Sequence, residues 1–166
     1  MLSAVLAVVS AVVVLVADQF TKYYVSSNFV YGESVEFLKG FMDLQYIHNE
    51  GAAWGMLSGY TWVLLSLTVI VMLVLITLLM KYGKNSKLLF WAVSLVVAGG
   101  FGNLIDRVFR GGKVVDFLHF EFFPSFPIFN IADISVVVGA GLLILYFIVD
   151  TVAERKKIKE QNNGDI

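Results

Sequence analysis

Four long apolar runs, separated by shorter polar segments, dominate the pattern of hydrophobic and polar positions along the chain. Each run approaches the roughly 20 residues that an α-helix needs to cross the hydrocarbon core of a bilayer. We therefore predict transmembrane helices over about residues 2–25, 60–80, 88–105 and 128–149. The first run follows no basic segment and continues directly into polar residues, which favours a retained helix over a cleaved secretory signal.

The two longer connections between these runs, residues 26–59 and 107–127, have a pattern of their own. Residues 35–49 and 113–123 mix apolar, aromatic and β-branched residues in short, partly alternating runs, as strands do. We expect a small β element on the membrane surface, with its aromatic rings at headgroup level. The predicted fold is an all-α polytopic membrane protein, four transmembrane helices with a small extracytoplasmic β element, in a single domain of residues 1–166.

Positive charge in the short connections predicts the orientation in the membrane, because Lys and Arg concentrate on the cytoplasmic side. The hairpin of residues 81–87 carries only lysine charges, and the tail of residues 154–159 is rich in cations. With four spans, this hairpin and both termini share one side. Both termini are therefore predicted to be cytoplasmic, and the connections 26–59 and 107–127 to lie outside. Arg107, Arg110 and Lys113 weaken this charge bias without reversing it.

Composition narrows the classes of function. Hydrophobic residues make up 58% of the 166-residue chain, more than a soluble core of that size needs, so membrane phospholipids are expected neighbours. The net charge of -1 gives no basis for binding nucleic acid. The chain has no cysteine, which excludes a thiol nucleophile and thiolate metal sites. His48 and His119 lie in separate loops and are expected to pack at the interface, so neither a metal nor a cofactor is predicted.

Polar residues gather at one depth, the outer boundary of the membrane. Spacings of three and four residues place the polar side chains of the first and third helices on one face of each helix. Ionisable groups near membrane helices are costly and usually serve a function, and an ion path would place them deeper. The convergence predicts a functional site that is built from Asp18, Lys22, Asn49, Asn103, Asp106, Arg107, Asp116, Asn130 and Asp133.

Structural roles remain open for several of these residues. Asp18 and Lys22 have the spacing of a surface ion pair along a helix. Asp106 beside Arg107 has the pattern of a structural ion pair at a helix end, an interpretation as good as direct chemistry. Asn130 is a helix N-cap candidate with Asp133 in the first turn, which is compatible with catalysis.

Paired carboxyl groups that activate a water can hydrolyse a peptide without a metal or a cysteine. Asp116 lies between apolar neighbours, which disfavour its ionisation, whereas Asp133 lies at a predicted helix N-terminus, which favours the anion. The hypothesis is that the pair shares one proton, with Asp133 closer to the base and Asp116 closer to the acid. A non-enzymatic transporter subunit or scaffold is the main alternative, although it leaves the polar convergence unexplained. A Ser/Lys peptidase is a weaker one, because Lys22 is the only lysine placed in a helix near the site.

Five short motifs occur in the order found in bacterial lipoprotein signal peptidases, also called signal peptidase II, and the chain closely resembles that family over almost its whole length. The motifs are Asp-Gln-Phe-Thr-Lys at 18–22, Asn-Glu-Gly-Ala-Ala-Trp-Gly at 49–55, Gly-Asn-Leu-Ile-Asp-Arg at 102–107, Val-Val-Asp-Phe at 114–117 and Phe-Asn-Ile-Ala-Asp at 129–133. Each motif is weak alone, but five in order are specific.

The resemblance implies a membrane-embedded aspartyl endopeptidase that removes the signal peptide from diacylglyceryl-modified prolipoproteins, cleaving before the lipidated cysteine. It implies a bacterial cytoplasmic membrane, an active site near the outer leaflet surface, and Asp116 and Asp133 as the catalytic dyad. No metal or cofactor is implied, and a monomer is expected. The substrate-binding or supporting residues are expected to be Asp18, Lys22, Asn49, Gly51, Asn103, Asp106, Arg107 and Asn130.

Overall fold

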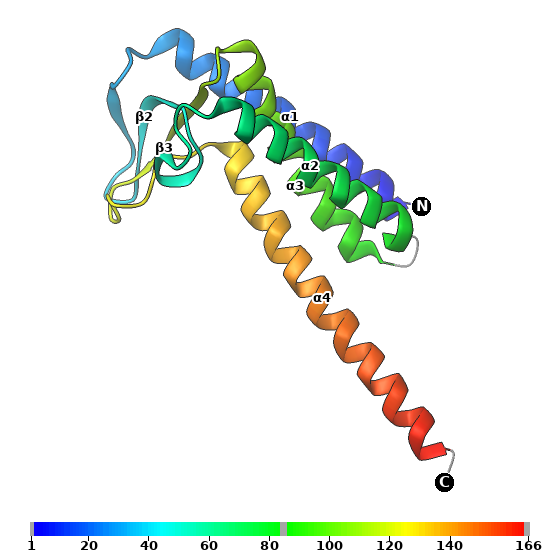
Figure 1. Cartoon of the computed structure of the whole chain (residues 1–166). Coiled ribbons are helices and arrows are strands. Elements are labelled where there is room, and N and C mark those ends of the chain that lie inside the picture. The colour runs from blue at the N-terminus through cyan, green and yellow to red at the C-terminus, as the bar shows by residue number, and fades with distance from the viewer. Residues whose placement is uncertain (1, 84–85, 165–166) are drawn as a thin grey trace.

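The computed structural model describes residues 2–83 and 86–164, and within them a helical bundle carries a small sheet at one end (Figure 1). Lys84 and Asn85 of the predicted basic hairpin lie outside the described residues. The fold prediction, four long apolar helices and a small β element, is confirmed. The elements in chain order are α1 (Leu2–Asn28), β1 (Ser34–Leu38), β2 (Met42–Asn49), a 3-10 turn (Ala53–Gly55), α2 (Thr61–Tyr82), α3 (Lys87–Phe109), β3 (Val114–Phe120) and α4 (Ile131–Gly164).

Helix α3 is the centre of the bundle, because it packs against α1, α2 and α4. Small residues allow this packing, as is usual between membrane helices. A Cβ atom added at Gly139 of α4 would lie 2.7 Å from Val96 Cγ2 of α3, and one added at Gly99 of α3 would meet the backbone of Ala132. Contact along α3 therefore fixes where the polar ends of α1, α3 and α4 meet.

The sheet is antiparallel with the order β1-β2-β3, so β2 is its central strand. Asp116 of β3 pairs with Ile47, and Val114 pairs with Asn49. Buried apolar side chains of the strands pack on Val25 at the end of α1. This packing holds the sheet against the bundle and brings the middle of β3 to the helix ends.

A sharp reversal connects α3 to β3. Gly111 and Gly112 have φ angles of 64° and 90°, a conformation that glycine adopts without steric cost. The Gly112 N–H donates to the Arg107 carbonyl at 2.9 Å, which closes the end of the helix. The returning strand then donates its Val115 N–H to Asp106 Oδ2 at 3.0 Å. The reversal places Asp116 beside the last turn of α3.

The fourth helix differs most from its predicted range, 128–149, because it begins at Ile131 and continues to Gly164. Its start is later because Phe129 pairs with the outer edge of β3, where its N–H donates to the Leu118 carbonyl at 3.0 Å. Its end is later because residues 150–161 are mostly good helix formers, which continue the helix beyond the apolar stretch. Figure 1 shows α4 extending well past the other helices.

Candidate active site

Asp116 lies in the middle of β3 with a side chain that is 1% exposed. Its Oδ1 accepts a hydrogen bond from Asn130 Nδ2 at 2.6 Å, and its Oδ2 accepts one from Asn49 Nδ2 at 3.0 Å. Burial, followed by repulsion from Asp133, raises the pKa of Asp116 to about 7, although both hydrogen bonds act in the opposite direction. A substantial share of these carboxyl groups therefore still carries a proton at neutral pH.

Asp133 is the third residue of α4 and takes part in the cap of that helix. Its Oδ2 accepts the Asn130 N–H at 3.1 Å, while its own N–H donates to Asn130 Oδ1 at 2.9 Å. This reciprocal arrangement is a capping box. The remaining oxygen, Oδ1, accepts from Asn103 Nδ2 at 2.7 Å. Both oxygens of Asp133 are therefore hydrogen-bonded, and the carboxyl group lies at the positive end of the helix dipole.

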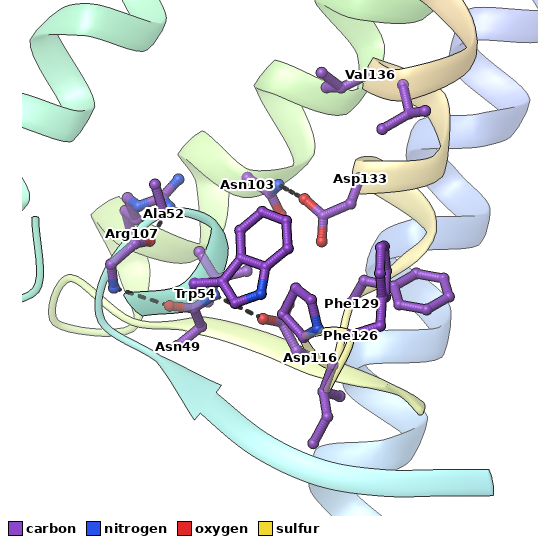
Figure 2. Close-up of a pocket in the computed structure, with 15 residues that line it drawn as sticks. Asn49, Ala52, Trp54, Asn103, Arg107, Asp116, Phe126, Phe129, Asp133 and Val136 are labelled. Carbon is purple, nitrogen blue, oxygen red and sulfur yellow. Dashed lines mark hydrogen bonds between the residues drawn. The ribbon is translucent and has the colours of Figure 1, made fainter. Parts of the chain in front are cut away.

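Asn130 joins the two carboxyl groups. It is fully buried, and it donates to Asp116 through its side chain and to Asp133 through its backbone. Its Nδ2 also lies 3.1 Å from Asn103 Oδ1. A single residue therefore orients both carboxyl groups, which line one cavity (Figure 2).

A buried cluster of charges supports this arrangement from the side of α1. Lys22 is fully buried, and its Nζ contacts Asp18 Oδ2 at 2.9 Å and Asp106 Oδ2 at 3.3 Å. Its third contact is a hydrogen bond of 2.9 Å to Asn103 Oδ1. An ammonium group can only donate, so it fixes the Asn103 amide with its oxygen toward Lys22. The amide nitrogen is thereby directed to Asp133.

The two acidic residues of the cluster have structural contacts as well. Asp18 Oδ1 accepts the Ala132 N–H at 2.8 Å and so caps the start of α4 from another helix. Asp18 and Lys22 are therefore a buried pair, and the interpretation as a surface pair is wrong. Asp106 pairs with Lys22 and, at 3.3 Å, with Arg110, rather than with Arg107 as the alternative had it.

Arg107 instead holds the loop that follows β2. Its Nη2 donates to the Gly51 carbonyl at 2.9 Å, and the Gly51 N–H donates to Asn49 Oδ1 at 2.9 Å. Gly51 is buried, and a Cβ atom there would lie 2.6 Å from the Met56 carbonyl oxygen. This close packing fixes the Asn49 amide so that its nitrogen reaches Asp116.

The cavity at these carboxyl groups has a volume of about 440 Å³. Trp54 forms part of its wall, with its ring edge-to-face with Phe126 at 6.2 Å between centroids (Figure 2). Trp54 also has a φ of 54°, a strained value for a residue other than glycine. The lining residues are Asn49, Gly51, Ala52, Trp54, Asn103, Arg107, Val114, Asp116, Phe126, Pro127, Ile128, Phe129, Asp133, Val136 and Val137.

The structure thus brings all the predicted site residues into one connected region, with Asp18, Lys22, Asp106 and Asn130 behind the cavity wall. Sequence analysis missed Arg110 and Gln19, which contact Asp106 at 3.3 Å each. The spacing of four residues between Asp106 and Arg110 was a signal for the first. His48 bonds the Tyr46 hydroxyl at 2.8 Å, and His119 lies 3.8 Å from Asp43. Within residues 2–83 and 86–164, no three or more acidic or histidine side chains cluster as a metal site.

A bundle of four apolar helices with two carboxyl groups in one cavity at its end is the architecture of a membrane-embedded aspartic peptidase, and the protein falls in this class. The chain belongs to the signal peptidase II family, since the family model, described as signal peptidase (SPase) II, matches residues 10–149.

Individual relatives agree with the family. The chain is 42% identical over 151 residues to a lipoprotein signal peptidase of Bacillus pumilus (strain SAFR-032), which covers 90% of this chain and 94% of the relative. It is 44% identical over 147 residues to one of Enterococcus faecalis (strain ATCC 700802 / V583), covering 89% and 88%. A bacterial membrane enzyme solved by the in meso method at 2.3 Å matches with a TM-score of 0.83 and 38% identity, over 91% of this chain and 90% of that one. The protein is a multi-pass membrane protein of bacteria.

Proposed function

We propose that Asp116 and Asp133 form the catalytic dyad of this peptidase. The observation that carries the proposal is that both carboxyl groups line one cavity and both accept hydrogen bonds from Asn130. Their environments differ: burial raises the pKa of Asp116 to about 7, whereas Asp133 accepts hydrogen bonds at a helix N-terminus. Two carboxyl groups in one cavity that share a proton can supply the acid and the base of the reaction.

The two groups act on one water and one peptide bond. Asp133 takes a proton from the water while the oxygen of that water bonds to the carbonyl carbon of the substrate. At the same time Asp116 gives its proton to the carbonyl oxygen. Collapse of the tetrahedral intermediate returns the hydroxyl proton to Asp116 and breaks the C–N bond. The leaving nitrogen takes the proton from Asp133, which restores both starting forms.

The substrate that we propose is a bacterial prolipoprotein with a diacylglyceryl-modified cysteine, cut immediately before that cysteine. The relatives' name, lipoprotein signal peptidase, supports the substrate class. The apolar side of the cavity, at Val136 and Val137 of α4, suits the signal helix and the acyl chains. Confinement of the substrate to the membrane plane raises its local concentration at the dyad.

We propose that the sheet end of the bundle faces outward, near the surface of the outer leaflet, and that both termini are cytoplasmic. The lysines at 81, 84 and 87 and the basic tail support this orientation. The start of α1 lies at the end of the bundle away from the sheet (Figure 1). We further propose that membrane phospholipids surround the bundle and that the protein acts as a monomer.

The supporting residues divide by the carboxyl group that they serve. Asn49, held by Gly51 and Arg107, positions Asp116. Asn103, held by Lys22, positions Asp133. Asn130 positions both carboxyl groups. Asp18 and Asp106 balance the charge of Lys22 and tie α1 and α3 to the site, a role that their contacts with the Lys22 ammonium at 2.9 Å and 3.3 Å support.

Cleavage by purified protein of a diacylglyceryl-modified prolipoprotein tests the proposal. Asp116→Asn and Asp133→Asn should each lower kcat by about 100-fold to 10,000-fold, the range that general acid-base groups contribute. Matched controls are Asp43→Asn, in the same sheet, and Asp150→Asn, in the same helix as Asp133; both lie outside the cavity lining and should leave kcat unchanged. Full activity in a folded variant of Asp116 or Asp133 would show that the replaced residue is not part of the dyad. Loss of cleavage when a chelator removes metal ions would refute the metal-free mechanism.

A further inference from the structure

A second hollow lies beyond the dyad cavity, against the sheet. Its volume is about 640 Å³, and we call it the outer cleft. The outer cleft and the dyad cavity are neighbours, because six residues line both. These residues are Asn49, Gly51, Trp54, Phe126, Pro127 and Ile128.

The two spaces differ in chemistry. The dyad cavity continues toward Val136 and Val137 of α4, which are apolar. The side chains that line only the outer cleft are mostly polar: Gln45, His48, Glu50, Ser58, His119 and Ser125. Burial lowers the pKa of His48, which favours its neutral form, and Lys113 pairs with Glu50 at 2.9 Å, which balances that charge. The outer cleft is therefore rich in hydrogen-bonding groups with little net charge.

A substrate peptide with its scissile bond at the dyad has two ends to accommodate. Its signal helix and acyl chains are apolar and match the α4 side of the cavity. The residues after the lipidated cysteine belong to the mature protein, which leaves the membrane, and their backbone needs hydrogen-bond partners wherever it is desolvated. The outer cleft, which shares six lining residues with the dyad cavity, is a neighbouring space that offers such partners.

We propose that the outer cleft is a binding subsite for the mature segment of the substrate, an extended polar peptide that follows the lipidated cysteine. This inference rests on the proposed function. Gln45 of β2 and Ser125, which lies between β3 and α4, both line the outer cleft, and each exchanges hydrogen bonds with the mature segment. The subsite makes cleavage depend on residues beyond the cysteine as well as on the signal peptide and lipid.

Two substrates test the subsite. They share the signal peptide, the diacylglyceryl group and the cysteine; one continues for six polar residues and the other ends in an amide one residue after the cysteine. The enzymes are the unmodified protein, Gln45→Ala, Ser125→Trp, which fills the cleft, and a control, Glu36→Gln. Glu36 is exposed on β1 and lines neither space.

For the unmodified protein and the control, kcat/KM should be about tenfold higher for the long substrate than for the short one. This ratio corresponds to the net free energy of roughly two hydrogen bonds. Gln45→Ala, which removes one of these hydrogen bonds, should lose about threefold on the long substrate and nothing on the short one. Ser125→Trp should abolish the advantage of length. Equal loss on both substrates, or no advantage of length in the unmodified protein, overturns the subsite while leaving the peptidase. No cleavage of either substrate by the unmodified protein refutes the proposed function and the subsite with it.

Discussion

Replacing Lys22 by Met removes the cation at the centre of the buried charge cluster. Lys22 is fully buried, and its ammonium contacts two carboxylates and one amide within 3.3 Å. Met has a similar length, so the change leaves little empty space. The effect should therefore come from charge. Asp106 keeps Arg110, whereas Asp18 keeps hydrogen bonds from Gln19 and the Ala132 N–H but, among the residues that the structure describes, no cation within 4 Å.

Breaking a buried ion pair on one side costs about 3–5 kcal/mol, because it leaves an uncompensated charge. The free energy of unfolding of Lys22→Met should fall by about that amount. Adding Asp18→Asn should recover more than half of the loss, since it removes the isolated charge and retains an acceptor for the Ala132 N–H. Adding Asp106→Asn should recover much less, because Asp18 stays isolated and Arg110 loses its partner.

The assay is unfolding by sodium dodecyl sulfate in mixed micelles, followed by circular dichroism, with kcat measured in parallel. We expect kcat of the Asp18→Asn/Lys22→Met protein to stay low even where stability recovers, because the Asn103 oxygen then keeps only its longer hydrogen bond from Asn130, at 3.1 Å, and the amide is held less firmly toward Asp133. Unchanged stability of Lys22→Met would refute the reasoning from charge. Equal recovery in the two double variants would refute the assignment of Arg110 to Asp106.

Two further predictions concern the acid group and the helix junction. The pKa of Asp116 is raised to about 7 and its protonated form is the proposed acid, so kcat/KM should fall as pH rises through about 7; a profile flat from pH 6 to 9 would contradict that role. Gly102→Ala should destabilise the protein by about 1–3 kcal/mol, since its Cβ would lie 2.6 Å from Asp18 Oδ2 and 3.1 Å from Ala132 Cβ. Gly141→Ala, with no atom within 4 Å of the new Cβ, should cost no stability in the same measurement and should add up to about 1 kcal/mol, since Ala favours a helix more than Gly does.

The helices and strands were readable from the sequence because membrane spans and half-buried strands have strong periodic patterns. The start of α4 was not, because the role of Phe129 depends on which strand passes beside it. Phe129 is apolar, so hydropathy alone cannot tell whether it begins the helix or pairs with Leu118 of β3. The predicted span therefore began at residue 128, before the true start of α4 at Ile131.

The site was readable as a set of residues but not as a set of contacts. Helical spacing placed Asp18 and Lys22 together, yet only the packing of α1 on α3 decides that the pair is buried and shared with Asp106. Asp106 and Arg107 are neighbours in sequence but point about 100° apart on a helix, which is why Arg107 reaches Gly51 instead. Such choices depend on tertiary geometry that no local pattern encodes.

The central claim is that the carboxyl groups of Asp116 and Asp133 act together on one oxygen. The most direct test is a solved structure of the protein with a lipidated peptide in which a secondary alcohol replaces the scissile bond. We predict that the hydroxyl oxygen lies within about 3 Å of one oxygen from each carboxyl group. A hydroxyl group that contacts only one of them, or neither, with the rest of the peptide bound in the cavity, would contradict the account.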